Sequence, residues 1–84
     1  MALRLDTLLC RLRFVKTRGR AQKLIADGLI RVDGTRCIKP DTKIDAGQVL
    51  TLPLPSGIAV VRVLTLPERR GPAAETRACY EPVK

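Results

Sequence analysis

The spacing of leucines near the N-terminus predicts an amphipathic helix over about residues 5–14. Four of them recur at the intervals i, i+3, i+4 and i+7 and form one apolar stripe: Leu5, Leu8, Leu9 and Leu12. Asp6 falls in the first turn, where a carboxylate interacts favourably with the helix dipole and can accept hydrogen bonds from free N–H groups. We therefore interpret the stripe as core and Asp6 as a helix-start residue.

A second helix is predicted over residues 18–27. Thr17 is a residue type that caps helix N-termini, and Gly28 suits the left-handed conformation that often follows a helix. The helical period places three residues on one apolar face: Ala21, Leu24 and Ile25. A basic face lies about 80–100° round the helix and holds Lys16, Arg20 and Lys23.

After the second helix the hydrophobic period changes to two, which indicates strands. Residues 29–32 and 35–37 form a predicted hairpin around a tight turn at Asp33-Gly34. Pro40 interrupts the pattern, so we expect this hairpin to be short.

Two further segments are the longest strand-like runs of the chain. Residues 48–54 and 58–66 are rich in Val and Leu, and a Ser-Gly turn between them suits an antiparallel pair. Pro67 is expected to end the sheet. A short helix is expected near residues 73–80.

These elements predict the α+β class, with two N-terminal helices packed on a small, mostly antiparallel sheet. We assign residues 1–67 to one domain and residues 68–84 to a polar, partly disordered C-terminal tail. A chain of 84 residues and 9.3 kDa has no room for a second domain.

The charge of the chain points to an anionic partner. The sequence contains sixteen Lys and Arg residues and eight Asp and Glu residues, which gives a net charge of +8 and a pI of about 10.3. Residues 1–43 carry a net charge of +7, and residues 44–84 carry +1. Six basic residues occur with no acidic residue between them: Arg11, Arg13, Lys16, Arg18, Arg20 and Lys23. Such a dense patch of one sign is typical of a polyanion-binding surface.

Missing residue types argue against catalysis and metal binding. The sequence contains no His, so neither a Ser-His-Asp nor a Cys-His nucleophile can be assembled. The only cysteines are too few for a zinc site and too widely spaced: Cys10, Cys37 and Cys79. We expect reduced thiols, no cofactor, no metal and a cytoplasmic location.

Membrane and targeting segments are not expected. No apolar run approaches the roughly 20 residues of a membrane span. Charged residues interrupt every candidate signal-peptide core in residues 1–20. An organelle transit peptide is disfavoured because this segment lacks Ser and contains Asp6.

An ordered set of short motifs in residues 3–52 resembles the RNA-binding domain first described in small-subunit ribosomal protein four, the S4 domain. These motifs are Arg4-Leu5-Asp6, Phe14-Val15-Lys16-Thr17-Arg18, Ala21, Ile25, Gly28, Val32-Asp33-Gly34 and Lys39-Pro40. The Lys-Thr-Arg motif, the Arg-Arg-Gly-Pro-Ala run at residues 69–73 and the later Tyr80 are most similar to the heat-shock-protein-fifteen branch, which is associated with the large ribosomal subunit.

The resemblance implies a two-helix and hairpin unit, the alpha-L motif, that binds structured RNA. Carried over to matching positions, it implies RNA contacts by Arg4, Lys16, Thr17, Arg18, Arg20, Lys23, Arg36 and Lys39. The charge patch adds Arg11 and Arg13, which completes the predicted site. The target expected on this basis is ribosomal RNA or the large ribosomal subunit, bound by a monomer.

The residues themselves support the same mode of binding. One Phe and one Tyr cannot build a base-stacking platform, so recognition should depend on phosphates, 2′-hydroxyls and shape. Arginine forks match phosphate oxygens in pairs, and the helix start near Thr17 adds free N–H groups. Duplex DNA, an anionic membrane and an acidic protein remain alternative partners for the same basic face.

Overall fold

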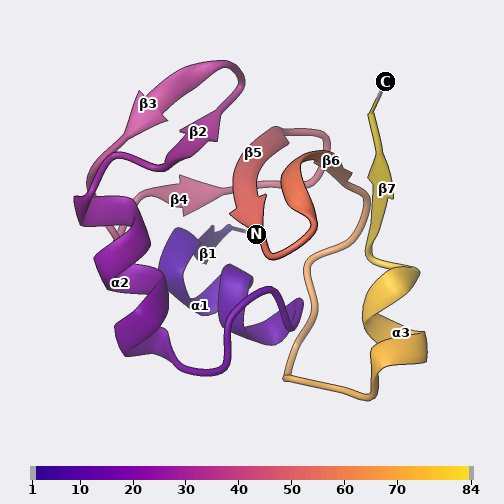
Figure 1. Ribbon diagram of the computed structural model, residues 1–84. Helices are drawn as coiled ribbons and strands as arrows, with labels where there is room; N and C mark the ends of the chain where they lie inside the picture. The colour runs from indigo at the N-terminus through magenta and orange to yellow at the C-terminus, as the bar shows by residue number, and fades with distance from the viewer. Residues whose placement is uncertain (1, 84) are drawn as a thin grey trace.

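The computed structural model describes residues 2–83 (Figure 1). Its helices are α1 (Leu5–Arg11), α2 (Arg18–Ala26) and α3 (Ala73–Arg77). Its strands are β1 (Leu3–Arg4), β2 (Ile30–Val32), β3 (Thr35–Cys37), β4 (Lys43–Ile44), β5 (Val49–Leu54), β6 (Gly57–Val63) and β7 (Tyr80–Pro82). This is the α+β arrangement that the sequence predicts.

The main sheet is antiparallel throughout, with the strand order β3-β2-β5-β6-β7. Its centre is the predicted pair β5–β6, whose register runs from Val49 opposite Arg62 to Leu54 opposite Gly57. Strands β1 and β4 form a separate two-stranded ladder, in which Leu3 faces Ile44. The sequence did not predict this ladder, because two-residue strands show no measurable alternation.

The α1–α2 pair agrees with the sequence except at the end of α1. The helix stops at Arg11, three residues before the expected end, because Arg13 adopts the left-handed conformation with φ +64°. The side chain of Thr17 caps α2 as predicted, accepting a hydrogen bond from the Arg20 N–H at 3.2 Å. Gly28 follows α2 with φ +75°.

The β2–β3 hairpin turn is of the expected type, with positive φ at Asp33 and at Gly34 (51° and 82°). The Asp33 side chain also makes hydrogen bonds to residues outside the hairpin. Its carboxylate accepts hydrogen bonds from the Val49 N–H at 2.9 Å and from Gln48 Nε2 at 3.1 Å. These bonds lower the pKa of Asp33 and attach the hairpin turn to the start of β5.

The prediction that Pro67 ends the sheet is wrong. The chain returns through α3, and β7 pairs with β6 so that Val63 faces Tyr80. The ring of Tyr80 also packs against Phe14, with ring centres 4.8 Å apart. This strand is short and polar, so only its long-range pairing with the free edge of β6 identifies it. Helix α3 is shorter than expected and ends at Arg77.

The core lies between the α1–α2 pair and the sheet. All four leucines of the predicted stripe are buried, and they pack with residues from α2, β2, β4, β5 and β6: Ala21, Ile25, Ile30, Ile44, Leu50, Leu52, Val61 and Val63. Leu24 was expected on the same face but is only half-buried at its edge. Packing on α1 thus fixes the position of α2 and of the basic residues that α2 carries.

Candidate nucleic-acid interface

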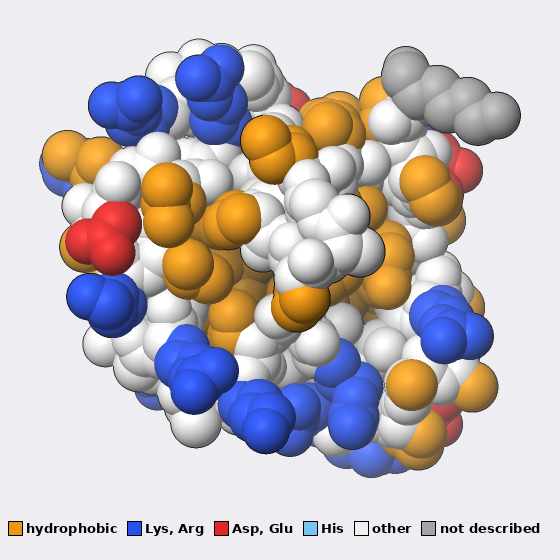
Figure 2. All heavy atoms as spheres, in the orientation of Figure 1, with side chains coloured by type: hydrophobic (Ala, Val, Ile, Leu, Met, Phe, Trp, Pro, Cys, Tyr) orange, Lys and Arg blue, Asp and Glu red, His pale blue; other side chains and the backbone are white. Residues whose placement is uncertain are grey.

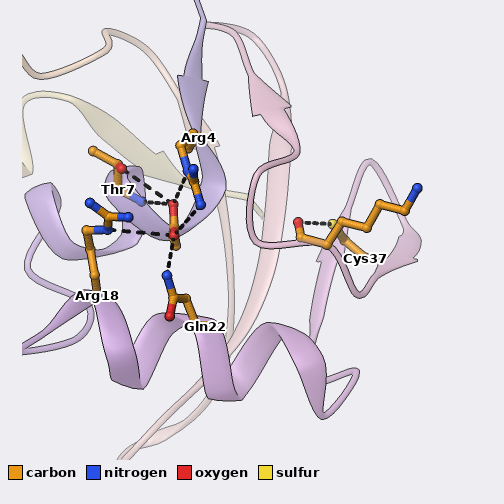
Figure 3. Close-up of polar contacts among 7 residues, drawn as sticks. Arg4, Thr7, Arg18, Gln22 and Cys37 are labelled. Atoms are coloured by element: carbon orange, nitrogen blue, oxygen red, sulfur yellow. Dashed lines mark hydrogen bonds and ion pairs between the residues drawn. The ribbon is translucent and has the colours of Figure 1, made fainter.

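Asp6 is the centre of a polar network that joins α1 to α2 (Figure 3). Its carboxylate is fully buried and accepts hydrogen bonds from Arg4 Nε and Nη2, both at 3.1 Å. Gln22 of α2 donates a third bond from Nε2 at 3.0 Å, and the Thr7 N–H donates a fourth at 2.7 Å. Arg18 Nε lies 3.7 Å from the same carboxylate.

This network holds Asp6 in its charged form. Burial by itself raises the pKa of Asp6, but the hydrogen bonds from Arg4, Gln22 and the Thr7 N–H outweigh that effect. The net result is a pKa below its ordinary value of 3.8. The charged carboxylate in turn orients two predicted RNA-contact residues, Arg4 and Arg18, whose side chains remain 40% and 56% exposed. Asp6 is therefore a positioning residue as well as a helix-start residue.

The outer face of α2 presents a second basic group. Arg20 and Lys23 are exposed and flank a shallow depression together with Leu24 and Asp27. Lys23 forms an exposed ion pair with Asp27, with Nζ 3.7 Å from Oδ2, which is worth little in water. Lys16 and Thr17, in the loop before α2, are also exposed. Figure 2 shows Lys and Arg side chains along the lower margin of the molecule, over α2 and this loop.

The β2–β3 hairpin contributes a third basic group. Arg36 and Lys39 line one depression, whose wall is completed by Val32, Thr35, Cys37, Ile38 and Thr42. Cys37 lies in the wall of this depression, with Sγ 3.1 Å from Thr42 Oγ1. Its Sγ is also 3.6 Å from the Lys39 carbonyl oxygen, as Figure 3 shows. A Cβ on Gly28 would lie 3.1 Å from Cδ of Arg36, so this glycine lets the Arg36 side chain lie over the end of α2. The Arg36 side chain thus lies against the C-terminal end of α2.

Arg11 and Arg13 are placed differently from the other members of the predicted site. Arg11 Nη1 donates a hydrogen bond to the Pro67 carbonyl oxygen at 3.0 Å. Arg13 Nη1 donates one to the Gly71 carbonyl oxygen at 3.1 Å. Each side chain therefore tethers the segment between β6 and α3 to the end of α1, a role that the charge pattern did not indicate.

Sequence reasoning missed Arg69 and Arg70 as candidate contact residues. Both line a depression that also includes Arg11, Arg18, Thr7, Cys10 and Glu68. The adjacent arginines were visible in the sequence as part of a family motif. Their place beside the start of α2 depends on contacts across more than fifty positions, which no local pattern indicates.

Two features of other site classes are absent from the described part of the chain. Residues 2–83 contain no group of three or more Cys, Asp or Glu side chains placed to hold a metal ion. No helix in this part of the chain has the length and apolar character needed to cross a bilayer.

Comparisons with known proteins agree with the geometry. The model of the S4 domain family matches residues 3–50. Heat shock protein 15 of Escherichia coli (strain K12) is 36% identical over 78 residues, which cover 93% of this chain and 58% of the relative. Small ribosomal subunit protein uS4 of Phytoplasma mali is 43% identical over 49 residues, covering 58% of this chain and 25% of that protein. The match with this chain therefore spans little more than half the length of the Escherichia coli relative.

A solved structure has the same fold along the whole chain. It is that of Vibrio cholerae heat shock protein 15, described as trimeric, with a TM-score of 0.92 and 26% sequence identity. The superposition covers 99% of this chain and 83% of the other. The likeness thus includes α3 and β7 as well as the segment that the family model matches.

Proposed function

This chain belongs to the S4 domain family, and we propose on that basis that it is a non-catalytic protein that binds folded RNA through its phosphate backbone. The observation that carries the proposal is the placement of exposed cations on α2, on the loop before it and on the neighbouring hairpin. Figure 2 shows Lys and Arg side chains over both the α2 region and the hairpin on one face of the molecule. A surface of this kind suits closely spaced phosphate strands.

The positions of the aromatic residues favour backbone recognition over base stacking. Phe14 and Tyr80 are the only Phe and Tyr of the sequence, and it contains no Trp. Both are partly buried, and they pack against each other with an interplanar angle of 55°. They are committed to the fold, so the interface would read phosphates, 2′-hydroxyls and the shape of the RNA.

We propose large-subunit ribosomal RNA as the target and the cytoplasm as the location. The resemblance to the heat-shock-protein-fifteen branch supports the large subunit, and the similarity to uS4 proteins supports a ribosomal setting. We also propose the monomer as the binding unit, because one copy of the chain carries the cations at Asp6, on α2 and on the hairpin.

A side-by-side binding measurement tests this function. Labelled RNA stem-loops, DNA duplexes of equal length and anionic lipid vesicles are titrated with the protein at physiological salt. We expect the RNA to bind most tightly, and large-subunit ribosomal RNA to compete better than small-subunit ribosomal RNA. Equal or tighter binding of duplex DNA or vesicles would contradict the proposed RNA preference.

A further inference from the structure

The segment between β6 and α3 is held by two hydrogen bonds, one to the end of α1 and one to the loop that follows it. Arg11 binds the Pro67 carbonyl oxygen and Arg13 binds the Gly71 carbonyl oxygen, at 3.0 and 3.1 Å. The two bonds span 56 and 58 positions of sequence. Between these anchor points lie the exposed residues 68–70, which are thereby held beside the start of α2.

Four arginines from three parts of the chain converge there. Arg11 of α1, Arg18 of α2, Arg69 and Arg70 line one depression of about 450 Å³. Glu68 is the only acidic residue of its lining, so the group carries a net charge of +3. Like charges this close repel one another, and a surface selected only for solubility would mix the signs.

The acidic partners of these arginines leave the depression positive. Arg18 lies 3.7 Å from the buried Asp6, which orients it. Arg69 lies 3.7 Å from Glu75 of α3 in an exposed pair, and its side chain remains 73% exposed. Arg70 forms no ion pair with any residue in the described range 2–83. The exposed guanidinium groups of Arg18, Arg69 and Arg70 are therefore available to an anion that approaches from solvent.

We propose that this depression binds a phosphate group of the RNA backbone, so that residues 68–70 form part of the interface. The proposal rests on the RNA-binding function above and extends it from the S4-matched residues to the C-terminal segment. Guanidinium groups suit this ligand, because each can donate two parallel hydrogen bonds to phosphate oxygens. This phosphate would lie near the phosphates bound by the outer face of α2, on the same RNA strand or on an adjacent one.

Two matched double variants test the proposal. The first is Arg69→Gln with Arg70→Gln, which removes two charges from the depression. The second is Arg62→Gln with Arg77→Gln, which removes two exposed charges outside it. In each pair one arginine has a surface ion pair with a glutamate, Arg69 with Glu75 and Arg62 with Glu81. Each variant thus removes two positive charges and one surface ion pair.

Binding of both variants to a labelled RNA stem-loop is measured as a function of salt, after melting curves confirm that they are folded. We expect Arg69→Gln/Arg70→Gln to weaken binding about 10-fold at low salt and to reduce the log–log salt slope by one to two units. We expect Arg62→Gln/Arg77→Gln to change the affinity less than about 2-fold. Equal effects of the two variants, or no effect of either, would overturn the proposal.

A third variant separates this inference from the proposed function. Arg20→Ala with Lys23→Ala removes cations from the outer face of α2. If this variant weakens binding and the Arg69/Arg70 variant does not, only the extension to residues 68–70 fails. If neither variant weakens binding, the proposed RNA-binding function fails with it.

Discussion

The carboxylate of Asp6 and the side-chain amide of Gln22 are joined by a 3.0 Å hydrogen bond across the interface between α1 and α2. Arg18, one turn before Gln22 on α2, lies 3.7 Å from the same carboxylate, and Arg4 contacts it twice. One buried anion therefore sets the orientation of two partly exposed arginines and contributes to the packing of α1 on α2. The packing of α1 on α2 and the orientation of Arg4 and Arg18, two candidate RNA-contact residues, therefore depend on the same residue.

Replacing Asp6 should destabilise the protein substantially. Asp6→Ala removes a fully buried charge that accepts hydrogen bonds from Arg4, Thr7 and Gln22. Breaking a buried ion pair commonly costs 3–5 kcal/mol, but Arg4 and Arg18 are partly exposed and can be rehydrated, so we expect a loss of about 2–3 kcal/mol. Urea denaturation measures it. The control is Asp27→Ala, which removes an exposed ion pair with Lys23 and should cost at most about 0.5 kcal/mol. Equal losses would refute the structural role of Asp6.

Below pH 8, stability should fall only on the acidic side. The pKa of Asp6 is lower in the folded protein than its ordinary value of 3.8, and so is that of Asp33. Their stabilising effect is therefore fully present above about pH 5 and is lost as the pH falls below 3.8 toward their folded-state values. The sequence contains no His, so melting temperatures should be nearly constant between pH 5 and pH 8. In Asp6→Asn the acid-induced drop should be smaller, and an unchanged drop would show that other carboxylates cause it.

The hairpin turn needs glycine for its backbone conformation. Gly34 has φ +82°, and no atom beyond its two chain neighbours lies within 4 Å of a Cβ built there, so the strain of Gly34→Val comes from the backbone conformation. We expect a loss of about 1 kcal/mol or more. Gly19→Ala is the contrasting variant, because Gly19 lies in the first turn of α2 and does not have a positive φ. Alanine favours the helix more than glycine, so this variant should raise the free energy of unfolding by up to about 1 kcal/mol. Chemical denaturation of both variants checks the pair, and an unchanged midpoint for Gly34→Val would contradict the turn assignment.

Substitutions of buried residues on α2 should destabilise the protein, and substitutions of its exposed basic residues should not. Ile25 is fully buried, so Ile25→Ala should lower the free energy of unfolding by about 2–5 kcal/mol. Leu24 is only half-buried, so Leu24→Ala should lower it by less. Arg20→Ala and Lys23→Ala should stay within about 0.5 kcal/mol of the parent. Thermal melts rank the variants. A large loss from either surface change would mean that the basic face supports the fold.

Local patterns were sufficient for the parts of the fold that lie close together in sequence. The leucine stripe, the Thr17 cap and the Asp33-Gly34 turn each need only a few neighbouring residues, and the structure has all three. The end of α1 was placed too late because the positive φ at Arg13 leaves no mark on hydrophobic spacing.

Long-range partners explain what the sequence could not show. Strand β7 depends on the free edge of β6, and β1 depends on β4 some forty positions away. The placement of Arg69 and Arg70 beside Arg18 depends on hydrogen bonds from Arg11 and Arg13 to carbonyl groups that could belong to any residue. The distribution of charge along the sequence indicates a basic N-terminal half, but it does not indicate that Arg69 and Arg70 lie beside Arg18 on the same surface.

The most direct test of backbone recognition is the salt dependence of RNA binding. The protein is titrated with a labelled RNA stem-loop at several salt concentrations, and the logarithm of the affinity is plotted against the logarithm of the salt concentration. About six bound phosphates predict a slope of about −4 to −5. The slope should become shallower by about one unit for each cation removed in Arg20→Ala and Lys23→Ala. A slope near zero, or one that these variants leave unchanged, would contradict binding through the basic face.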